Sequence, residues 1–195
     1  MMRRILTLVL AAVSLTFLNG PADAGGHHDQ GSIYERGPYD NRYEFVDDSC
    51  GFEFHLRGRA RGFSTTYNVP GSDGQAFLLD DYYSFFEVLT NPANGKRMYI
   101  SGWGHLKEVK ATHVEGDVWE FIAVDSGTPF VVRDKRGRLV LKDQGKLVYR
   151  QVFDTLGDSE PGGEELDFEV LSIRGHFPSL APDFDFCAMV SDLIG

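Results

Sequence analysis

Apolar and polar residues alternate with a period of two along much of the chain after residue 49. The clearest segments are residues 50–57, 146–153 and 166–171. Successive side chains of a β-strand point to opposite faces of the sheet, so this period predicts half-buried strands. Two further segments, 82–89 and 118–124, are apolar at nearly every position. Such runs predict strands that lie centrally or beneath a covering segment.

Turn signals separate these segments. The Asn94-Gly95 dipeptide lies between two apolar runs, and Asn-Gly readily adopts the positive φ that a tight hairpin needs. Short connections of this kind favour antiparallel neighbours. No segment predicts a long helix, although residues 187–194 could form a short helical turn. The predicted strands lie near residues 50–60, 61–67, 75–80, 82–90, 97–103, 106–114, 118–124, 129–133, 138–142, 146–154 and 166–174, some of which we expect to merge.

This succession of hairpins predicts an all-β fold. The form we expect is an antiparallel up-and-down β-barrel of about eight to ten strands, with a β-sandwich as the alternative. A closed barrel leaves no exposed sheet edge, which favours it over the sandwich. An outer-membrane barrel would need an apolar outward band on every strand. Charged residues such as Lys142, Lys146 and Arg150 occupy one face here, which argues against that class.

The beginning of the chain has the pattern of a secretory signal peptide. Arg3 and Arg4 are followed by residues 5–18, which carry no charge, and then by Ala22-Asp23-Ala24. A basic start, a short apolar run and an A-x-A site are typical of a cleaved signal. The run is shorter than the roughly 20 residues that span a bilayer. We therefore expect residues 1–24 to be removed, the protein to be secreted, and the mature chain to lack a transmembrane segment.

The rest of the chain divides into two parts. Residues 25–48 have no sustained apolar period and predict a flexible lead-in, whereas residues 49–195 are predicted to form the barrel domain. The two cysteines, Cys50 and Cys187, allow a single pairing. Export would place them in an oxidising compartment, so we expect a disulfide rather than a reactive thiol. The disulfide would close a loop of well over a hundred residues. In the chain-entropy model, closing such a loop stabilises the folded state by roughly 4–5 kcal/mol.

The charge of the chain limits its partners. The formal net charge is −10 at pH 7. An acidic chain is repelled by phosphate backbones, so nucleic acid is not an expected partner. Anionic membrane surfaces are disfavoured for the same reason.

The aromatic content offers a candidate ligand site. The chain has 15 Phe, eight Tyr and two Trp. Inward-facing aromatic residues could line an apolar cavity or fill a packed core. Gly102 and Gly104, on either side of Trp103, predict a bulge or a close approach of backbones. The residues that we expect to face the barrel interior, and to contact a small apolar ligand there, are Phe52, Phe54, Phe85, Tyr149 and Phe168.

Polar groups give no catalytic signature. The sequence contains no HExxH, CxxC, GxSxG, P-loop or EF-hand pattern. The histidines within the folded region and acidic pairs such as Asp80-Asp81 are interpreted as surface groups. The favoured function is a non-catalytic barrel without a catalytic cofactor, which binds a small apolar ligand or a cell-surface protein. The alternative is a barrel enzyme of cyclase or isomerase type, for which a buried carboxylate or histidine within an apolar interior would be evidence.

The predicted mature amino terminus has one sharper chemical feature. Cleavage after Ala24 would leave the sequence Gly25-Gly26-His27. The terminal amine, two deprotonated amides and the imidazole can then lie at the corners of a square, a geometry that suits Cu(II) and Ni(II). Glycine at the first two positions leaves the plane uncrowded. We therefore expect a copper or nickel site formed by these three residues.

The chain also resembles a group of known proteins. The signal peptide, Cys50-Gly51-Phe52, the segment TNPANGK at residues 90–96 and the closing CAMVSDLIG at residues 187–195 are similar to small secreted all-β proteins of actinobacteria. The resemblance covers roughly residues 48–195. It implies export and a disulfide-closed all-β fold, and it implies no catalytic residue.

Overall fold

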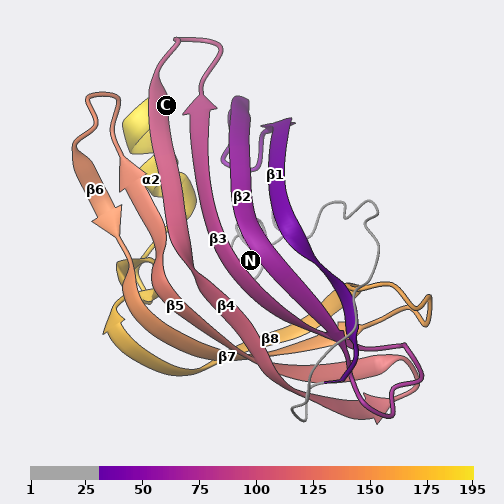
Figure 1. The fold of residues 1–195 in the computed structure, drawn as a ribbon. Helices are drawn as coiled ribbons and strands as arrows, with labels where there is room; N and C mark the ends of the chain where they lie inside the picture. The colour runs from indigo at the N-terminus through magenta and orange to yellow at the C-terminus, as the bar shows by residue number, and fades with distance from the viewer. Residues whose placement is uncertain (1–30) are drawn as a thin grey trace.

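A single antiparallel sheet of eight strands makes up most of the protein in a computed structural model, which describes residues 31–195 (Figure 1). The strand order is β1-β2-β3-β4-β5-β7-β8, with the short β6 paired to the end of β5. The elements are β1 (Ile33–Asp47), β2 (Phe54–Asn68), β3 (Phe77–Thr90), β4 (Arg97–Glu115), β5 (Val118–Arg133), β6 (Leu139–Lys142), β7 (Gln144–Asp154), β8 (Glu164–His176), the 3-10 helix η1 (Pro178–Leu180) and the helix α2 (Phe186–Ile194). The predicted all-β antiparallel class is confirmed.

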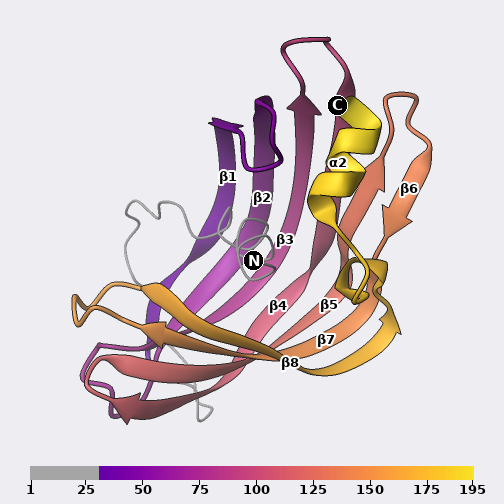
Figure 2. The same ribbon diagram turned by 180° about the vertical axis from the view of Figure 1, so that it is seen from behind.

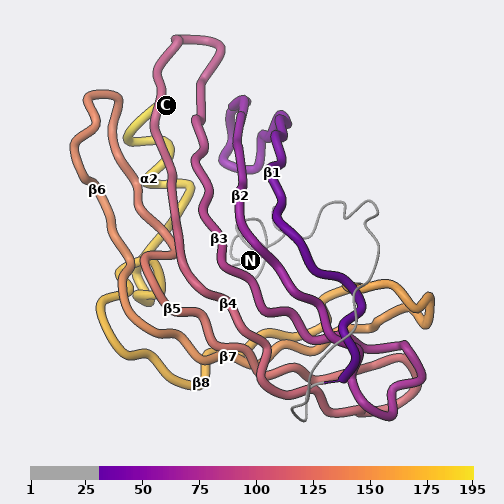
Figure 3. The backbone as a smooth tube through the Cα atoms, viewed as in Figure 1, coloured from indigo at the N-terminus to yellow at the C-terminus, as the bar shows by residue number. Residues whose placement is uncertain are grey.

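The sheet is strongly curved. β1, β2 and β3 run side by side, whereas β7 and β8 turn across the lower end of the molecule (Figure 3). α2 lies on the concave face of this curve (Figure 2). In the ladders of the described residues, β1 and β8 are the two edges of the sheet and do not pair with each other. The sheet therefore does not close into a barrel.

Several predicted strands merge into longer ones. The segments near 50–60 and 61–67 form β2, and those near 97–103 and 106–114 form β4. Gly58 and Gly62 fall within β2, and Gly102 and Gly104 fall within β4. Glycine lets a strand bend without breaking its ladder, so each pair of predicted segments forms one continuous strand. Of the predicted bulge or close approach of backbones, both are present: the register of β4 against β5 shifts between Ser101 and Trp103, and a Cβ atom on Gly102 would clash with the Pro129 carbonyl oxygen.

The expectation of a flexible lead-in over residues 25–48 is wrong for residues 33–47. These residues form β1, which pairs with β2 from Ile33 to Asp47. Half-buried and exposed positions alternate strictly along β1. Its inward positions include Glu35, Gly37 and Asn41, so the apolar period that marks the other strands is absent. The partner strand, rather than local apolar residues, holds this segment in the sheet.

The upper part of the concave face is an apolar core that α2 covers. Val190 and Ile194 of the helix are fully buried and pack with Phe54, Leu89 and Met98. The helix begins at Asp185, whose carboxylate accepts a hydrogen bond from the Ala188 amide at 3.0 Å. The short helix predicted at residues 187–194 is therefore confirmed.

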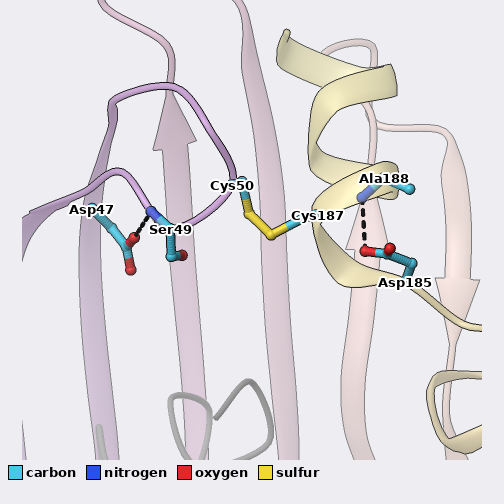
Figure 4. Close-up of a disulfide and its surroundings, with 6 residues drawn as sticks. All are labelled: Asp47, Ser49, Cys50, Asp185, Cys187 and Ala188. Carbon is cyan, nitrogen blue, oxygen red and sulfur yellow. Dashed lines mark hydrogen bonds between the residues drawn. A yellow bond between two sulfur atoms is a disulfide. The ribbon is translucent and has the colours of Figure 1, made fainter. Parts of the chain in front are cut away.

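A disulfide fixes α2 to the sheet. Cys50, in the turn between β1 and β2, is bonded to Cys187 in the first turn of α2 (Figure 4). The two residues are 137 positions apart. The predicted pairing is confirmed, and it connects the turn between β1 and β2 to the last element of the chain.

Two smaller clusters complete the core. One contains Ala123, Leu147 and Tyr149, and the other contains Trp119 and Phe121. No helix within residues 31–195 has the length and apolar character needed to cross a membrane.

Candidate functional site

The five aromatic residues predicted to contact a ligand divide between two clusters of the core. Phe52, Phe54 and Phe85 belong to the upper cluster beneath α2. Tyr149 and Phe168 belong to a lower cluster, where their ring centroids are 5.3 Å apart. The structure therefore brings three of these residues together at one end and two at the other.

Tyrosine–carboxylate pairs occupy the concave face along β3, and sequence reasoning did not anticipate them. Each tyrosine hydroxyl donates a hydrogen bond to a carboxylate. Because side chains alternate along a strand, Asp81, Tyr83, Phe85 and Glu87 share the inward face of β3. The three pairs are Tyr43 with Glu87 at 2.7 Å, Tyr39 with Asp81 at 3.0 Å, and Tyr83 with Asp125 at 2.9 Å.

Glycines make this arrangement possible. Each tyrosine belongs to one strand, its carboxylate lies two strands away, and a glycine occupies the strand between them. A Cβ atom added to Gly62 would lie 2.5 Å from the Tyr39 hydroxyl, and one added to Gly104 would lie 2.9 Å from the Tyr83 hydroxyl. Tyr43 crosses Gly58 in the same way. The absence of a side chain on the middle strand thus opens the path from each hydroxyl to its acceptor.

Asp81 is the most unusual member of the set. Its side chain is 1% exposed. Oδ2 accepts the hydrogen bond from Tyr39, whereas Oδ1 is buried and has no hydrogen-bond partner. Burial raises the pKa of Asp81 to about 6, although the Tyr39 hydrogen bond opposes that change. A buried acceptor without a donor is costly, and such groups are uncommon in folded proteins.

Asp125 lies close to Asp81, and the negative charge of Asp125 contributes to the raised pKa of Asp81. Both carboxylate oxygens of Asp125 are within 3.1 Å of the Tyr83 hydroxyl. Burial raises the pKa of Asp125 to about 6 as well. Burial also raises the pKa of Tyr83 above its usual value, so its hydroxyl remains a donor at neutral pH.

Two further carboxyl groups on the same sheet have raised pKa values. Glu108 accepts a hydrogen bond from the Leu79 amide at 2.7 Å, and burial raises its pKa to about 7. Burial raises the pKa of Glu87, against the effect of its bond to Tyr43. The concave face therefore holds several carboxyl groups that can exchange protons near neutral pH.

The interpretation of Asp80-Asp81 as a solvated acidic pair is wrong for Asp81. Adjacent strand residues point to opposite faces, so the pair is split by the sheet. Asp80 lies on the outer face, where its carboxylate is 2.8 Å from Nε2 of His105 and 3.1 Å from Nζ of Lys107. Asp81 lies inside. The signal was present in the segment DDYYSFFEVL, where a period of two places Asp81 with Tyr83 and Phe85.

The predicted metal site cannot be placed in the fold, because Gly25, Gly26 and His27 lie outside the described residues. Among residues 31–195, there is no group of three or more His, Cys, Asp and Glu side chains that could hold a metal ion.

Comparisons of the chain with family models, curated proteins and solved structures found no match.

Proposed function

We propose that the protein binds a small, largely apolar molecule on the concave face of its sheet and holds the polar group of that molecule at Asp81. One observation carries the proposal, namely the buried Oδ1 atom of Asp81 that lacks a hydrogen-bond donor. A ligand hydroxyl or amine would supply that donor. Ligand sites are commonly apolar with a few fixed polar groups, and Asp81 would be such a group.

The surroundings of Asp81 support an apolar ligand. Phe85 and Tyr83 lie on the same face of β3, with ring centroids 6.5 Å apart. Tyr149 is 2% exposed and belongs to the neighbouring lower cluster. Apolar rings near a buried acceptor would favour a molecule with a hydrocarbon body and a hydrogen-bond donor.

A pair of isomeric probes tests this proposal. Octan-1-ol and heptyl methyl ether have the same formula, but only the alcohol can donate a hydrogen bond. Isothermal titration of the full chain should show roughly ten- to a hundredfold tighter binding of the alcohol, because a hydrogen bond to a charged acceptor is worth roughly 1.5–3 kcal/mol. Asp81→Leu should remove that preference, and Asp40→Asn, which changes an outward carboxylate, should keep it. Binding of neither probe, or an unchanged preference in Asp81→Leu, would contradict the proposal.

A second function is favoured by the proximity of two carboxyl groups whose pKa values are both about 6. Asp81 and Asp125 lie together on an apolar face, and Tyr83 bonds to Asp125. General acids and bases work best when their pKa lies near the working pH. We therefore propose, as the alternative, an isomerase or cyclase that moves a proton within an apolar substrate.

Deuterium exchange tests the enzymatic alternative. The protein would be incubated in D2O with β,γ-unsaturated ketones, and NMR would follow deuterium uptake and migration of the double bond. Catalysis that falls at least a hundredfold in both Asp81→Asn and Asp125→Asn would support an acid–base role, consistent with the usual contribution of such groups of about 10²–10⁴. Catalysis that persists in both variants would exclude these two residues as the acid and base.

We also propose that the protein is secreted and that its curved sheet forms a barrel in the ligand-bound state. Its disulfide supports an oxidising compartment. The barrel proposal is supported by a hydrogen bond of 3.2 Å from Tyr34 on β1 to Glu160 in the loop between β7 and β8. That contact joins the two edges of the sheet at its lower end. A crystal structure with a bound probe would test whether β1 and β8 pair.

A further inference from the structure

The convex face of the sheet, opposite Asp81, carries a second feature, which we call the outer hollow. This face is turned toward the viewer in Figure 1, where α2 lies behind the sheet. The outer hollow has a volume of about 580 Å³ and is open to solvent. Its lining comes from β2, β3, β4 and β5 and includes Arg61, Tyr82, Ser84, Trp103, His105 and Ser126.

Aromatic rings dominate the exposed surface of the outer hollow. Tyr82 is 59% exposed and Trp103 is 50% exposed. The Tyr82 ring stacks on His105 with centroids 4.0 Å apart and an angle of 4° between the planes. Phe63, on the next strand, pairs with Tyr82 in the ladder and is also exposed. Phe63, Tyr82 and His105 thus form a row across three strands, about 10 Å long at the usual strand spacing.

The charge of this region is opposite to that of the whole chain. The nearby carboxylates are already paired, Asp80 with His105 and Lys107 and Asp40 with Arg59. Arg61 forms no ion pair within residues 31–195, although it faces Asp40 in the β1–β2 ladder and its charge helps to lower the pKa of that carboxyl group. Lys146 is the ladder partner of Ser126 at the edge of the hollow, and within residues 31–195 it has no ion-pair partner either. On a chain of net charge −10, two cations that lie outside any ion pair of the described residues favour an anionic ligand.

We propose that the outer hollow binds an acidic oligosaccharide that contains uronic acid residues. The apolar faces of sugar rings would stack on Tyr82 and Trp103, as flat ligands do on exposed aromatic side chains. The guanidinium of Arg61 would bind a uronate carboxylate, for which its geometry is well suited. The hydroxyls of Ser84 and Ser126 donate to the carbonyl oxygens of Arg61 and His105, so they would accept hydrogen bonds from the sugar hydroxyls. This site is independent of the function proposed for the concave face.

The dimensions of the outer hollow favour a sugar over a protein partner. Its volume falls within the 300–1,000 Å³ typical of small-ligand sites. Stable protein interfaces instead bury about 800 Å² on each partner, usually over a continuous apolar centre. Here Ser84 lies between Arg61 and Trp103 in the ladders of β2, β3 and β4, which provides hydrogen-bonding groups beside the rings where a protein interface would be dry. Within residues 31–195, the outer hollow is open to solvent, which leaves room for a sugar chain to lie across the strands.

Affinity electrophoresis of the full chain tests the proposal. Native gels would contain polygalacturonate, a uronic acid polymer, or hydroxyethylcellulose, a neutral one. Polygalacturonate should retard the parent protein several-fold more than hydroxyethylcellulose does, and added salt should weaken that retardation because ion pairs are screened. Trp103→Ala and Arg61→Gln should each lose most of it. Titration with tri-galacturonate should also protect Trp103 from acrylamide quenching in a Trp119→Phe background, where Trp103 is the remaining tryptophan.

Two control variants separate specific binding from general charge effects. Arg57→Gln removes an exposed arginine that pairs with Glu44, and Leu139→Ala removes an exposed apolar side chain on β6. Polygalacturonate should retard both as much as it retards the parent, each compared with its own mobility in a gel without polymer. Equal retardation by the two polymers, no retardation by either, or equal losses in Arg57→Gln and Arg61→Gln would overturn the proposal. Co-purification with a secreted protein that Trp103→Ala abolishes would instead assign the outer hollow to a protein partner.

Discussion

The hydroxyl of Tyr83 lies 2.9 Å from Oδ2 of Asp125, although β4 runs between the strands that carry these two residues. Tyr83 pairs with Gly104 in the ladder, and its side chain passes over that glycine to reach β5. Glycine is thus required at position 104 because a side chain there would block the contact between Tyr83 on β3 and Asp125 on β5. The same relationship recurs where Tyr39 crosses Gly62 to reach Asp81.

Gly104→Ala should destabilise the protein. The added Cβ would lie 2.8 Å from the Ser126 carbonyl oxygen and 2.9 Å from the Tyr83 hydroxyl, so the Tyr83–Asp125 bond would be displaced. Overpacking of this kind costs about 1–3 kcal/mol of the free energy of unfolding, measured by urea denaturation. Gly37→Ala is the matched control, because nothing lies within 4 Å of its added Cβ. Equal stability of the two variants would mean that the crossing is not needed.

Stability should fall as the pH rises from about 4 to about 6. Asp81 has a folded-state pKa of about 6 against 3.8 for the unfolded chain, so the native state holds more protons in this range. The fall attributable to Asp81 should be on the order of 2–3 kcal/mol. Thermal denaturation across this range should show it, and Asp81→Asn, which cannot ionise, should have a smaller slope.

Asp40 provides the control of opposite sign for the pH experiment. The hydrogen bond from Arg59 lowers the pKa of Asp40, so its contribution to stability is present above its unfolded pKa and is lost as the pH falls. Asp40→Asn should therefore leave the fall between pH 4 and pH 6 in place. If Asp81→Asn retains the full slope of the parent, the raised pKa of Asp81 is wrong.

Loss of the disulfide should cost on the order of 2–5 kcal/mol. The bond between Cys50 and Cys187 limits the unfolded chain and holds α2 against the sheet. Urea denaturation of the Cys50→Ser/Cys187→Ser double variant should show this loss. A reductant should destabilise the parent to the level of the double variant and leave the variant unchanged. Destabilisation of the double variant by the reductant would point to another cause.

Asp185→Ala should destabilise the protein by about 1 kcal/mol, because it removes the cap on the Ala188 amide at the start of α2. Asp183 lies in the same loop and is exposed, so Asp183→Ala controls for the loss of a negative charge. Chemical denaturation of both variants checks this expectation. A similar loss in Asp183→Ala would show that charge, rather than capping, is responsible.

The predicted amino-terminal site should bind one Cu(II) ion per mature chain. If cleavage falls after Ala24, a copper titration should produce the visible absorption band of a four-nitrogen square-planar site. His27→Ala should abolish that band, and so should one extra residue before Gly25, because the amine would then be misplaced. Edman sequencing that finds a different first residue, or copper bands that persist in both variants, would contradict this prediction.

Local pattern alone determined much of the fold. The period of two located most strands, because alternation between sheet faces is a property of each strand by itself. The two cysteines allowed one pairing, and the closing segment predicted a short helix; both are present. The strand β1 escaped detection because its inward positions carry Glu35, Gly37 and Asn41. Its structure depends on the ladder with β2, which local sequence does not report.

Tertiary structure alone decided the chemistry of the two faces. The sequence shows Asp80 and Asp81 as neighbours, yet the sheet places one in an outer ion pair and the other in the interior. Tyr39 and Asp81 are 42 residues apart. They meet because Gly62, on the strand between theirs, has no side chain to block the contact. A raised pKa comes from burial, and burial is set by what folds over a residue. Sequence therefore supplied the strands, whereas the curvature and register of the sheet determined which carboxyl groups lie inside it.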